Sequence, residues 1–382
     1  MKKKALYFLI SLLIAALFTI TGCDQIPLGA AAEGIATKPM VWKANTKTPV
    51  LLAPDTDANL NFGISVATDG TYAVVGAEGY NNYQGAAYIY KLESGRWNYK
   101  QTITAGDAVN GDSFGHSVAI SDPYIVVGAY LKSSQTGAVY VFERNVETWS
   151  AINNGDNGKI NPIVAIDSGG RWGSSVAISG KYLLAGAPLD KGTGTAHVFE
   201  QDEFGTWNNK TMTGATPASA ANYGAAVTIN SNFAAVGAPV DDDTGNENYG
   251  AVYIFMVSGN TWNIVEKYLA NDPATNGRFG TSISLTGNIC LIGTRAQNAS
   301  YIFQWNGSIW DQTDKITGST SISGDQFGYA VGFNGSFAFV GANLDDDAVS
   351  DSGSSFVFSI NSSGLGTETD IFHAPTPVNG RV

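Results

Sequence analysis

Hydrophobic and polar positions follow a pattern that repeats six times along the chain. Each copy begins at an aromatic residue followed by glycine, and successive copies start 48 to 58 residues apart. The six starting aromatic residues are Phe62, Phe114, Trp172, Tyr223, Phe279 and Phe327. A recurring period of this length indicates a repeat architecture, in which similar units stack on one another.

Within each copy the pattern predicts four short strands. The first follows the aromatic-glycine pair, as in residues 114–120, and ends at turn residues. The second is a continuous apolar run that closes on Gly-Ala, such as residues 74–77, which is typical of a strand buried on both faces. The third resembles Gly-Ala-Val-Tyr-Val-Phe at 137–142. The fourth begins at a tryptophan such as Trp149 and is more polar, which suits an outer edge.

The two ends of the chain predict how the series closes. The last copy ends near Ile360 and no tryptophan strand follows it. Residues 42–53 look like the missing strand, because they begin at Trp42 and lead to Asp55, seven residues before Phe62. We therefore expect residues 42–53 to form the outer strand of the last unit and to close a ring. The alternative is that residues 367–372 form that strand.

Such a ring predicts an all-β fold of the β-propeller type, with six four-stranded blades and with seven blades as the alternative. One blade cannot bury both of its faces alone, so neighbouring blades must supply the core. The glycine after each aromatic residue lets the innermost strands approach closely, and the aromatic ring fills the wedge between blades.

The N-terminus predicts export. Residues 2–4 are lysines and an apolar run of about 16 residues follows, shorter than the roughly 20 of a membrane span. The segment Ile-Thr-Gly-Cys at 20–23 resembles the lipobox of bacterial lipoproteins, which implies cleavage after Gly22 and acylation of Cys23. An uncleaved helix or an ordinary secretory signal is the alternative. We expect a signal peptide at 1–22, a tether at 23–37, the propeller at 38–363 and a C-terminal tail at 364–382.

The net charge and the cysteine content limit which partners and which disulfides are possible. Removal of residues 1–22 would change the formal net charge from −12 to −15, which argues against nucleic acid as a partner. The only cysteines are Cys23 and Cys290, so an acylated Cys23 leaves no intramolecular disulfide, and Cys290 is expected in the core. We expect a protein anchored to a membrane through Cys23, facing the periplasm or the cell surface.

Once the copies are aligned, the pairing of Phe-Gly with Gly-Ala-Pro resembles the FG-GAP repeat family. The full second half stands at residues 186–188 and 237–239, and the order of motifs is similar to the bacterial branch of the family. Six ordered copies cover residues 42–360. The resemblance implies a β-propeller like that of integrin α-subunits, which usually has seven blades.

Integrin-type repeats carry a calcium loop between the first and second strands. This chain has only short turns there, such as residues 179–181, so those calcium sites cannot be carried over. Acidic residues gather instead between the second and third strands, at Asp241, Asp242, Asp243, Asp345, Asp346 and Asp347. We expect solvated loops there, with a calcium site as the alternative. Tyrosines of the same set of loops are candidates for contact with a protein or glycan: Tyr80, Tyr83, Tyr130 and Tyr249.

Catalytic motifs are weak in this sequence. Residues 111–115 match the Gly-x-Ser-x-Gly nucleophile elbow, but that motif requires a strand-to-helix turn, and the last copy has Gln326 in place of the serine. His116, His197 and His373 stand at unrelated repeat positions and have no metal-ligand spacing. We therefore expect no enzyme, no catalytic residue and no certain cofactor. A propeller enzyme that acts on a polysaccharide is an alternative.

The leading hypothesis is a lipid-anchored binding or adhesion module. It would engage a protein or a glycan through its inter-strand loops, because function often lies on loops that a rigid frame holds. A scaffold component without a small-molecule ligand is a further alternative.

Overall fold

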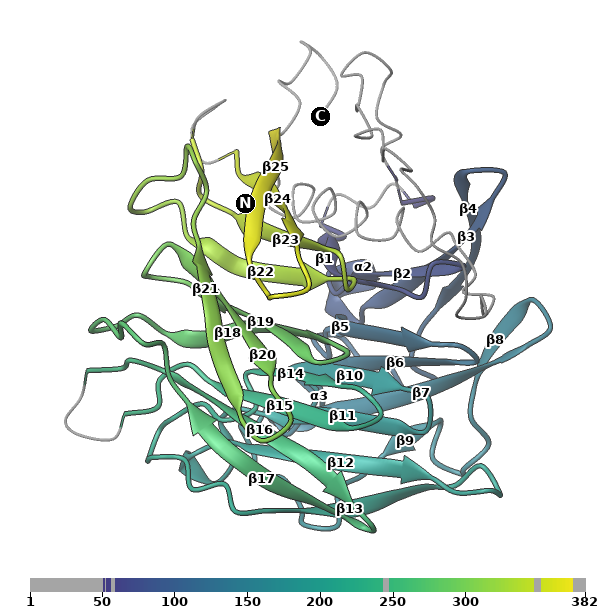
Figure 1. Cartoon of the computed structure of the whole chain (residues 1–382). Coiled ribbons are helices and arrows are strands. Elements are labelled where there is room, and N and C mark those ends of the chain that lie inside the picture. The colour runs from purple at the N-terminus through teal and green to yellow at the C-terminus, as the bar shows by residue number, and fades with distance from the viewer. Residues whose placement is uncertain (1–50, 52, 56–58, 243–246, 347–351, 374–382) are drawn as a thin grey trace, which may run out of the picture.

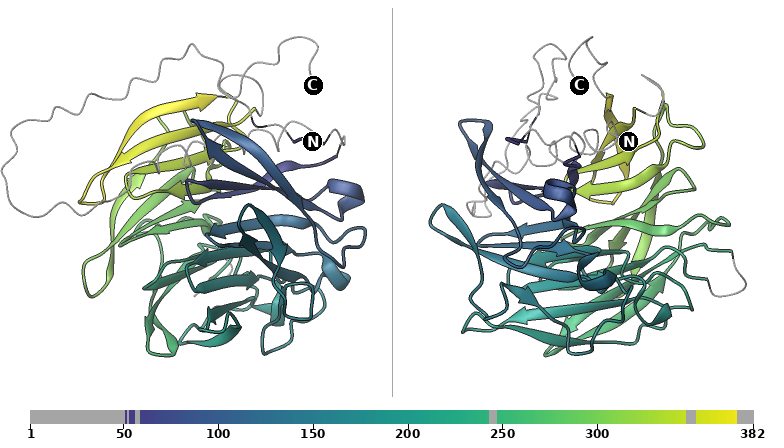
Figure 2. Two further views of the ribbon diagram at one scale, coloured as in Figure 1. Left: turned by 90° about the vertical axis from the view of Figure 1, so that its right-hand side faces the viewer. Right: turned by 180° about the vertical axis from the view of Figure 1, so that it is seen from behind.

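The computed structural model describes residues 51, 53–55, 59–242, 247–346 and 352–373. Figure 1 shows the strands arranged as a series of sheets, and both ends of the series lie at the same end of the molecule. Figure 2 shows the same arrangement from the side and from behind. The fold is an all-β propeller. No helix in these residues is long and apolar enough to span a membrane.

The strands follow the predicted order of four per repeat, and we number these units first to sixth along the chain. The first unit has β1 (Phe62–Thr68), β2 (Tyr72–Ala77), β3 (Ala86–Glu93) and β4 (Arg96–Ile103). The second has β5 (Phe114–Ser121), β6 (Tyr124–Ala129), β7 (Ala138–Asn145), β8 (Thr148–Ala151) and β9 (Lys159–Ile160). The third has β10 (Ser175–Ser179), β11 (Tyr182–Ala187), β12 (Thr195–Gln201) and β13 (Trp207–Thr213).

The second half of the chain repeats this order. The fourth unit has β14 (Ala226–Ile229), β15 (Phe233–Ala238), β16 (Ala251–Ser258) and β17 (Thr261–Tyr268). The fifth has β18 (Phe279–Thr286), β19 (Ile289–Thr294), β20 (Ala299–Trp305) and β21 (Trp310–Ile316). The sixth has β22 (Phe327–Phe333), β23 (Phe337–Ala342), β24 (Ser354–Ile360) and β25 (Gly366–His373). Short helical turns α2 (Tyr80–Tyr83), α3 (Lys132–Gln135) and η1 (Asp190–Gly192) lie between second and third strands.

Hydrogen bonding groups these strands into five sheets. The first, fifth and sixth units each form a four-stranded sheet, and the second forms a five-stranded sheet because β9 also pairs with β7. The third and fourth units share one eight-stranded sheet, joined through a parallel pairing of β13 with β17. The all-β propeller prediction is confirmed at this level, while the sheets do not divide into six separate blades.

The hydrophobic core lies between neighbouring units. Second strands such as β2 are buried at every position, because they run in the middle of a sheet that is covered on both faces. One core cluster joins Val74 and Ile89 of the first unit to Phe114 and Tyr140 of the second. Cys290 is fully buried in β19, which confirms its predicted place in the core.

The tryptophans of the outer strands also join neighbouring units. Trp149 of the second unit packs edge-on against Tyr72, the first residue of β2, with ring centroids 5.8 Å apart. Trp310 packs in the same way against Phe233, at 5.0 Å. The outer strands of the second to fifth units are therefore anchored to the second strand of the unit before them.

The prediction that residues 42–53 form the outer strand of the last unit is wrong. That place belongs to β25, which pairs antiparallel with β24, so the predicted tail at 364–382 contains a strand instead. Leu51 and Ala53 lie in no strand, and residues 42–50 and 52 lie outside the described residues. The missing tryptophan was misleading for a physical reason. The preceding unit begins its second strand with Ile289 instead of an aromatic residue, so β25 has no ring to pack against there.

Candidate functional site

Two of the four candidate tyrosines lie close enough to influence each other. Tyr83 is 45 % exposed, and its phenol is one of the groups that act on the pKa of Tyr130. Tyr80 instead turns inward and packs edge-on against Tyr88, with centroids 6.5 Å apart. Tyr249 is half-buried, and its carbonyl accepts a hydrogen bond from the backbone of Phe279. The structure therefore does not assemble the four tyrosines into one surface, but it places Tyr130 in a group of polar side chains.

That group consists of Glu78, His116, Tyr130 and Arg171, which we call the axial cluster. Glu78 directly follows β2, and Tyr130 directly follows β6. His116 is the third residue of the inner strand β5, and Arg171 directly precedes Trp172, which bridges to Gly137. All four residues therefore lie beside the inner strands, on the face that carries the loops between second and third strands.

The local backbone explains how His116 reaches Glu78 of the preceding unit. The register between β5 and β6 shifts between Phe114 and Ser117, so the strand bulges where His116 stands. Gly115 has φ of +90°, and its position lies against the carbonyl of Ala86 in the first unit. This conformation is accessible to glycine and strained for other residues, so the Phe-Gly motif itself holds the bulge against the neighbouring unit.

Geometry within the axial cluster is close. His116 Nδ1 lies 2.8 Å from Glu78 Oε2, and the two side chains are 28 % and 13 % exposed. The His116 ring stacks on Tyr130, with centroids 3.9 Å apart and planes 33° apart. The Arg171 guanidinium lies 5.8 Å from the centroid of the same tyrosine ring. A carboxylate, an imidazole, a phenol and a guanidinium thus form one continuous chain of contacts across three units.

The charges of the axial cluster affect how its members ionise. Burial raises the pKa of Tyr130, the negative charge of Glu78 raises it further, and Arg171 opposes both. Tyr130 therefore stays a neutral phenol in neutral solution. The Nε of Arg171 is buried and has no hydrogen-bond partner among the residues the structure describes. A buried donor of this kind is costly unless something accepts from it, so Arg171 is suited to an anionic or carbonyl oxygen of a ligand.

The junction between the fifth and sixth units has a related arrangement. Arg295 stands at the repeat position of Glu78, and Tyr329 stands at that of His116. The Arg295 guanidinium lies 5.5 Å from the Tyr329 ring centroid, and its Nε donates to Gln326 Oε1 at 3.2 Å. The same repeat positions thus present a second cation and a second aromatic ring on the loop-bearing face.

The acidic loops were expected to be solvated, but the first aspartate of each is buried. Asp241 is buried; its carboxylate accepts from Tyr253 Oη and lies 3.3 Å from Lys267 Nζ. Asp345 at the same repeat position is also buried, whereas Asp346 is exposed. Asp242 accepts from the backbone of Glu247, and Asp243 and Asp347 lie outside the described residues.

Within the described part of the chain, no group of three or more His, Cys, Asp or Glu side chains could hold a metal ion. Calcium needs six to eight oxygens, and a site that included Asp241 would have to displace its tyrosine and lysine partners. Asp241 is therefore held by partners within the protein.

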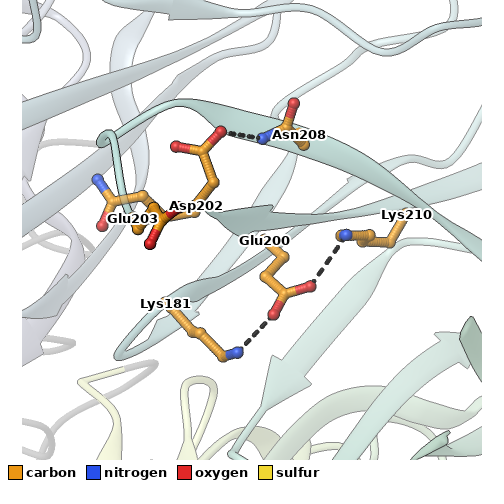
Figure 3. A pocket seen from close by; sticks show the side chains of 7 residues that line it. Lys181, Glu200, Asp202, Glu203, Asn208 and Lys210 are labelled. Carbon is orange, nitrogen blue, oxygen red and sulfur yellow. Dashed lines mark hydrogen bonds and ion pairs between the residues drawn. The ribbon is translucent and has the colours of Figure 1, made fainter. Parts of the chain in front are cut away.

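A shallow groove of about 580 Å³ lies at the outer edge of the third unit (Figure 3). Its charges are matched within the protein, because Glu200 pairs with Lys181 at 2.5 Å and with Lys210 at 3.1 Å. Asp202 accepts hydrogen bonds from the backbone of Phe204 and Thr206 and from Asn208. The Lys181 hydrogen bond holds the pKa of Glu200 below its usual value. Because these carboxylates are already paired within the protein, the groove is a weaker candidate than the axial cluster.

Sequence reasoning missed Glu78, His116 and Arg171. The signal was in the repeat alignment: the residue after each aromatic-glycine pair varies from Ile64 through His116 to Tyr329, while the strand around it is repeated. Such variation marks positions at which the fold does not determine the residue type. The serine of the elbow-like motif, Ser113, is buried and leads into β5, so it is not a nucleophile elbow.

Comparisons with known proteins agree with this fold. The FG-GAP repeat family matches residues 46–90, 97–142, 210–255 and 310–358. No match was found among curated proteins. A periplasmic gluconolactonase of Pseudomonas aeruginosa is similar in structure, with a TM-score of 0.52, 16 % identity and coverage of 86 % of this chain and 92 % of that one. A putative 6-phosphogluconolactonase of Bacteroides uniformis has a TM-score of 0.52, 14 % identity and coverage of 81 % and 88 %.

These neighbours correct one expectation. We expected no enzyme, yet both similar structures are named as lactonases, so the absence of a sequence motif was no basis for excluding catalysis on this fold. At this identity the likeness shows the fold alone. The chain therefore contains FG-GAP repeats in four places and folds as a β-propeller.

Proposed function

We propose that this protein is a hydrolase of sugar-derived lactones or related esters, with the axial cluster as its active site. The observation that carries this proposal is the 2.8 Å contact between Glu78 and His116 on the loop-bearing face. A carboxylate at one ring nitrogen orients a histidine and fixes its tautomer, so the other nitrogen is available as a general base. The substrate class in the names of both fold neighbours agrees with this chemistry.

The residues of the cluster suggest a sequence of steps. His116 Nε2 takes a proton from a water molecule while the water oxygen bonds to the lactone carbonyl carbon. Arg171 donates to the oxygen that gains negative charge, which is where a fixed cation lowers a barrier most. The ring C–O bond then breaks, and His116 returns the proton to the leaving ring oxygen. The product is an open-chain hydroxy acid, and the enzyme is unchanged.

Aromatic side chains beside the cluster support a sugar as substrate. Tyr83 is 45 % exposed, and Tyr130 already stacks on His116. Flat aromatic faces pack against the apolar faces of sugar rings, while a tyrosine hydroxyl remains free to bond to water or hydroxyl groups. A second candidate function, carbohydrate binding without turnover, is favoured by the same exposed Tyr83.

We also propose that the protein is exported and anchored through an acylated Cys23, as its N-terminal sequence indicates. Two or more acyl chains would make that attachment stable. The propeller would then act on sugars outside the cytoplasm.

For the architecture we propose six blades, one per unit. The eight-stranded sheet consists of two four-stranded meanders, and only three residue pairs between β13 and β17 join them. Each meander repeats the strand order of a complete unit, so the shared sheet is best described as two blades with touching outer edges.

The test is a continuous proton-release assay with glucono-1,5-lactone, galactono-1,4-lactone and a 6-phosphorylated gluconolactone, corrected for spontaneous hydrolysis. The wild type should open at least one of these lactones, and His116→Asn should lower kcat/KM about 100-fold or more. His373→Asn is the matched control, because His373 lies on β25 and contacts Ser354 at 2.9 Å. If no lactone is opened but calorimetry shows a sugar acid bound through Tyr83, the second candidate is correct.

A further inference from the structure

Most cationic side chains of the propeller are matched with a carboxylate. All nine lysines among the described residues lie within 4.0 Å of an Asp or Glu oxygen. Such pairing is expected in a chain that has 33 acidic residues and 21 lysines and arginines. Of the five described arginines, Arg144 alone forms a salt bridge, with Asp122 at 2.7 Å. The arginines without a carboxylate partner in the described part of the chain are Arg96, Arg171, Arg278 and Arg295.

Three of these four arginines lie on the loop-bearing face. Arg278 directly precedes the aromatic-glycine pair of the fifth unit, as Arg171 does in the third, and Arg295 directly follows β19. Arg96 instead begins β4, at the hairpin between a third and a fourth strand. In an antiparallel meander these hairpins lie at the opposite end from the loops between second and third strands. Cations without an internal carboxylate partner are therefore concentrated on one face of an acidic protein.

The sheet register brings two of the three arginines together. Strand β18 pairs antiparallel with β19, and Phe279 stands opposite Thr294 as the last pair at this end of the sheet. Arg278 directly precedes Phe279 and Arg295 directly follows Thr294, so the two arginines are neighbours beyond that pair. Both are exposed, and we call them the arginine pair. Like charges at facing positions repel each other, so an anion between them would relieve an unfavourable contact.

The backbone at Arg278 does not favour arginine. Its φ is +57°, in the left-handed region. The first and fourth units have Asn61 and Asn222 at the same repeat position, with φ of +48° and +55°. Asparagine is enriched in this conformation, whereas a long side chain there is uncommon. The fold would therefore accept asparagine at position 278 more readily, and the guanidinium is the feature that arginine adds.

Contacts with the sixth unit hold the guanidinium of Arg295 in place. Its Nε donates to Gln326 Oε1 at 3.2 Å, and the group lies 5.5 Å from the centroid of the Tyr329 ring. A cation over an aromatic ring is attracted to the face of that ring. Neither contact uses the two Nη groups. These groups, and those of Arg278, are donors in a planar fork that matches the oxygens of a carboxylate or a phosphate.

We infer that the arginine pair is a binding site for an oxyanion, the carboxylate or phosphate group of a sugar derivative. Tyr329 is 37 % exposed beside the pair and offers an aromatic face to the sugar. The pair lies on the same loop-bearing face as the axial cluster. The further step, that the lactone substrate itself carries this anionic group, rests on the proposed function.

Titration calorimetry with three probes tests this inference without any need for turnover. Glucose 6-phosphate carries a phosphate, gluconate carries a carboxylate, and glucitol is neutral. At least one anionic probe should bind about 10-fold or more tightly than glucitol, and Arg278→Gln and Arg295→Gln should each weaken its binding by about 10-fold or more. Arg96→Gln is the matched control, because Arg96 is also exposed and lies on the opposite face, so this variant should bind like the wild type.

Two results would overturn the inference. The first is equal affinity of the wild type for glucitol and for both anionic probes. The second is anion binding that survives both substitutions in the arginine pair but is lost in Arg171→Gln, which would assign the anion to the axial cluster. A protein that opens no lactone, yet binds an anionic probe through Arg278 and Arg295, would support this inference and reject the proposed function.

Discussion

At the residue scale, the aromatic-glycine motif sets how closely units approach. Gly115 has φ of +90°, and a β-carbon there would lie 2.2 Å from the carbonyl oxygen of Ala86. Gly111 has φ of +89° and nothing within 4 Å of the same position. A side chain at either glycine would strain the backbone, but only at Gly115 would it also collide with the neighbouring unit. Comparison of the two positions therefore distinguishes the two effects.

We predict that Gly115→Ala lowers stability by more than about 3 kcal/mol, because steric conflict adds to the strain of a positive φ. Gly111→Ala should be destabilised by backbone strain alone, which lowers its stability by about 1–2 kcal/mol. Thermal unfolding followed by calorimetry measures both. Equal losses in the two variants would show that the motif does not serve close approach.

A second residue-scale feature is an aspartate in the linker before the first, second and fifth units, which accepts a hydrogen bond from a third-strand tyrosine. Burial raises the pKa of Asp107, but hydrogen bonds from Tyr140 and Lys159 outweigh burial and hold that pKa below its usual value. A carboxyl group with a depressed pKa contributes stability above its unfolded pKa of about 3.9, and this contribution is lost as pH falls through the folded value.

We therefore predict that the melting temperature of the wild type falls as pH is lowered from about 5 to 2, and that Asp107→Asn shows a shallower fall over this range. The variant should start from a lower melting temperature at pH 7, because it loses the charge that Lys159 pairs with. Parallel pH profiles for the two proteins would rule out the contribution of Asp107.

At the element scale, the four strands of each unit could be predicted because their patterns differ. The second strand is apolar throughout and the fourth is polar after its tryptophan, as β2 and β4 show. The outer strand of the last unit could not be predicted from the same cue. A tryptophan begins the outer strand where an aromatic ring begins the second strand of the preceding unit. For β25 that position holds Ile289, which has no ring.

The assignment of β25 gives an element-scale prediction. A chain that ends at Ser363 should melt at a lower temperature and scatter light on heating, because β24 would become an exposed edge that can pair with other molecules. A chain that ends at His373 keeps β25 and should melt like the full-length protein. If the shorter chain is as stable as the longer one, β25 is not the outer strand.

At the scale of the whole molecule, the candidate site depends on how the units are placed around the axis. Glu78 and His116 come from different units, and their contact requires both the bulge in β5 and the close approach at Gly115. Separate inspection of three histidines could not show this. Alignment of the repeats identifies the variable positions, but the pairing of a carboxylate with an imidazole needs the placement of adjacent units.

The measurement that tests the account most directly is a double-mutant cycle on lactone hydrolysis with Glu78→Gln, His116→Asn and the combined variant. Because Glu78 acts through His116, each single change should lower kcat/KM about 100-fold, and the double variant should be close to the weaker single variant. Multiplicative losses near 10⁴-fold would show that the two residues act independently. Hydrolysis by His116→Asn at the wild-type rate would contradict the assignment of the active site to the axial cluster.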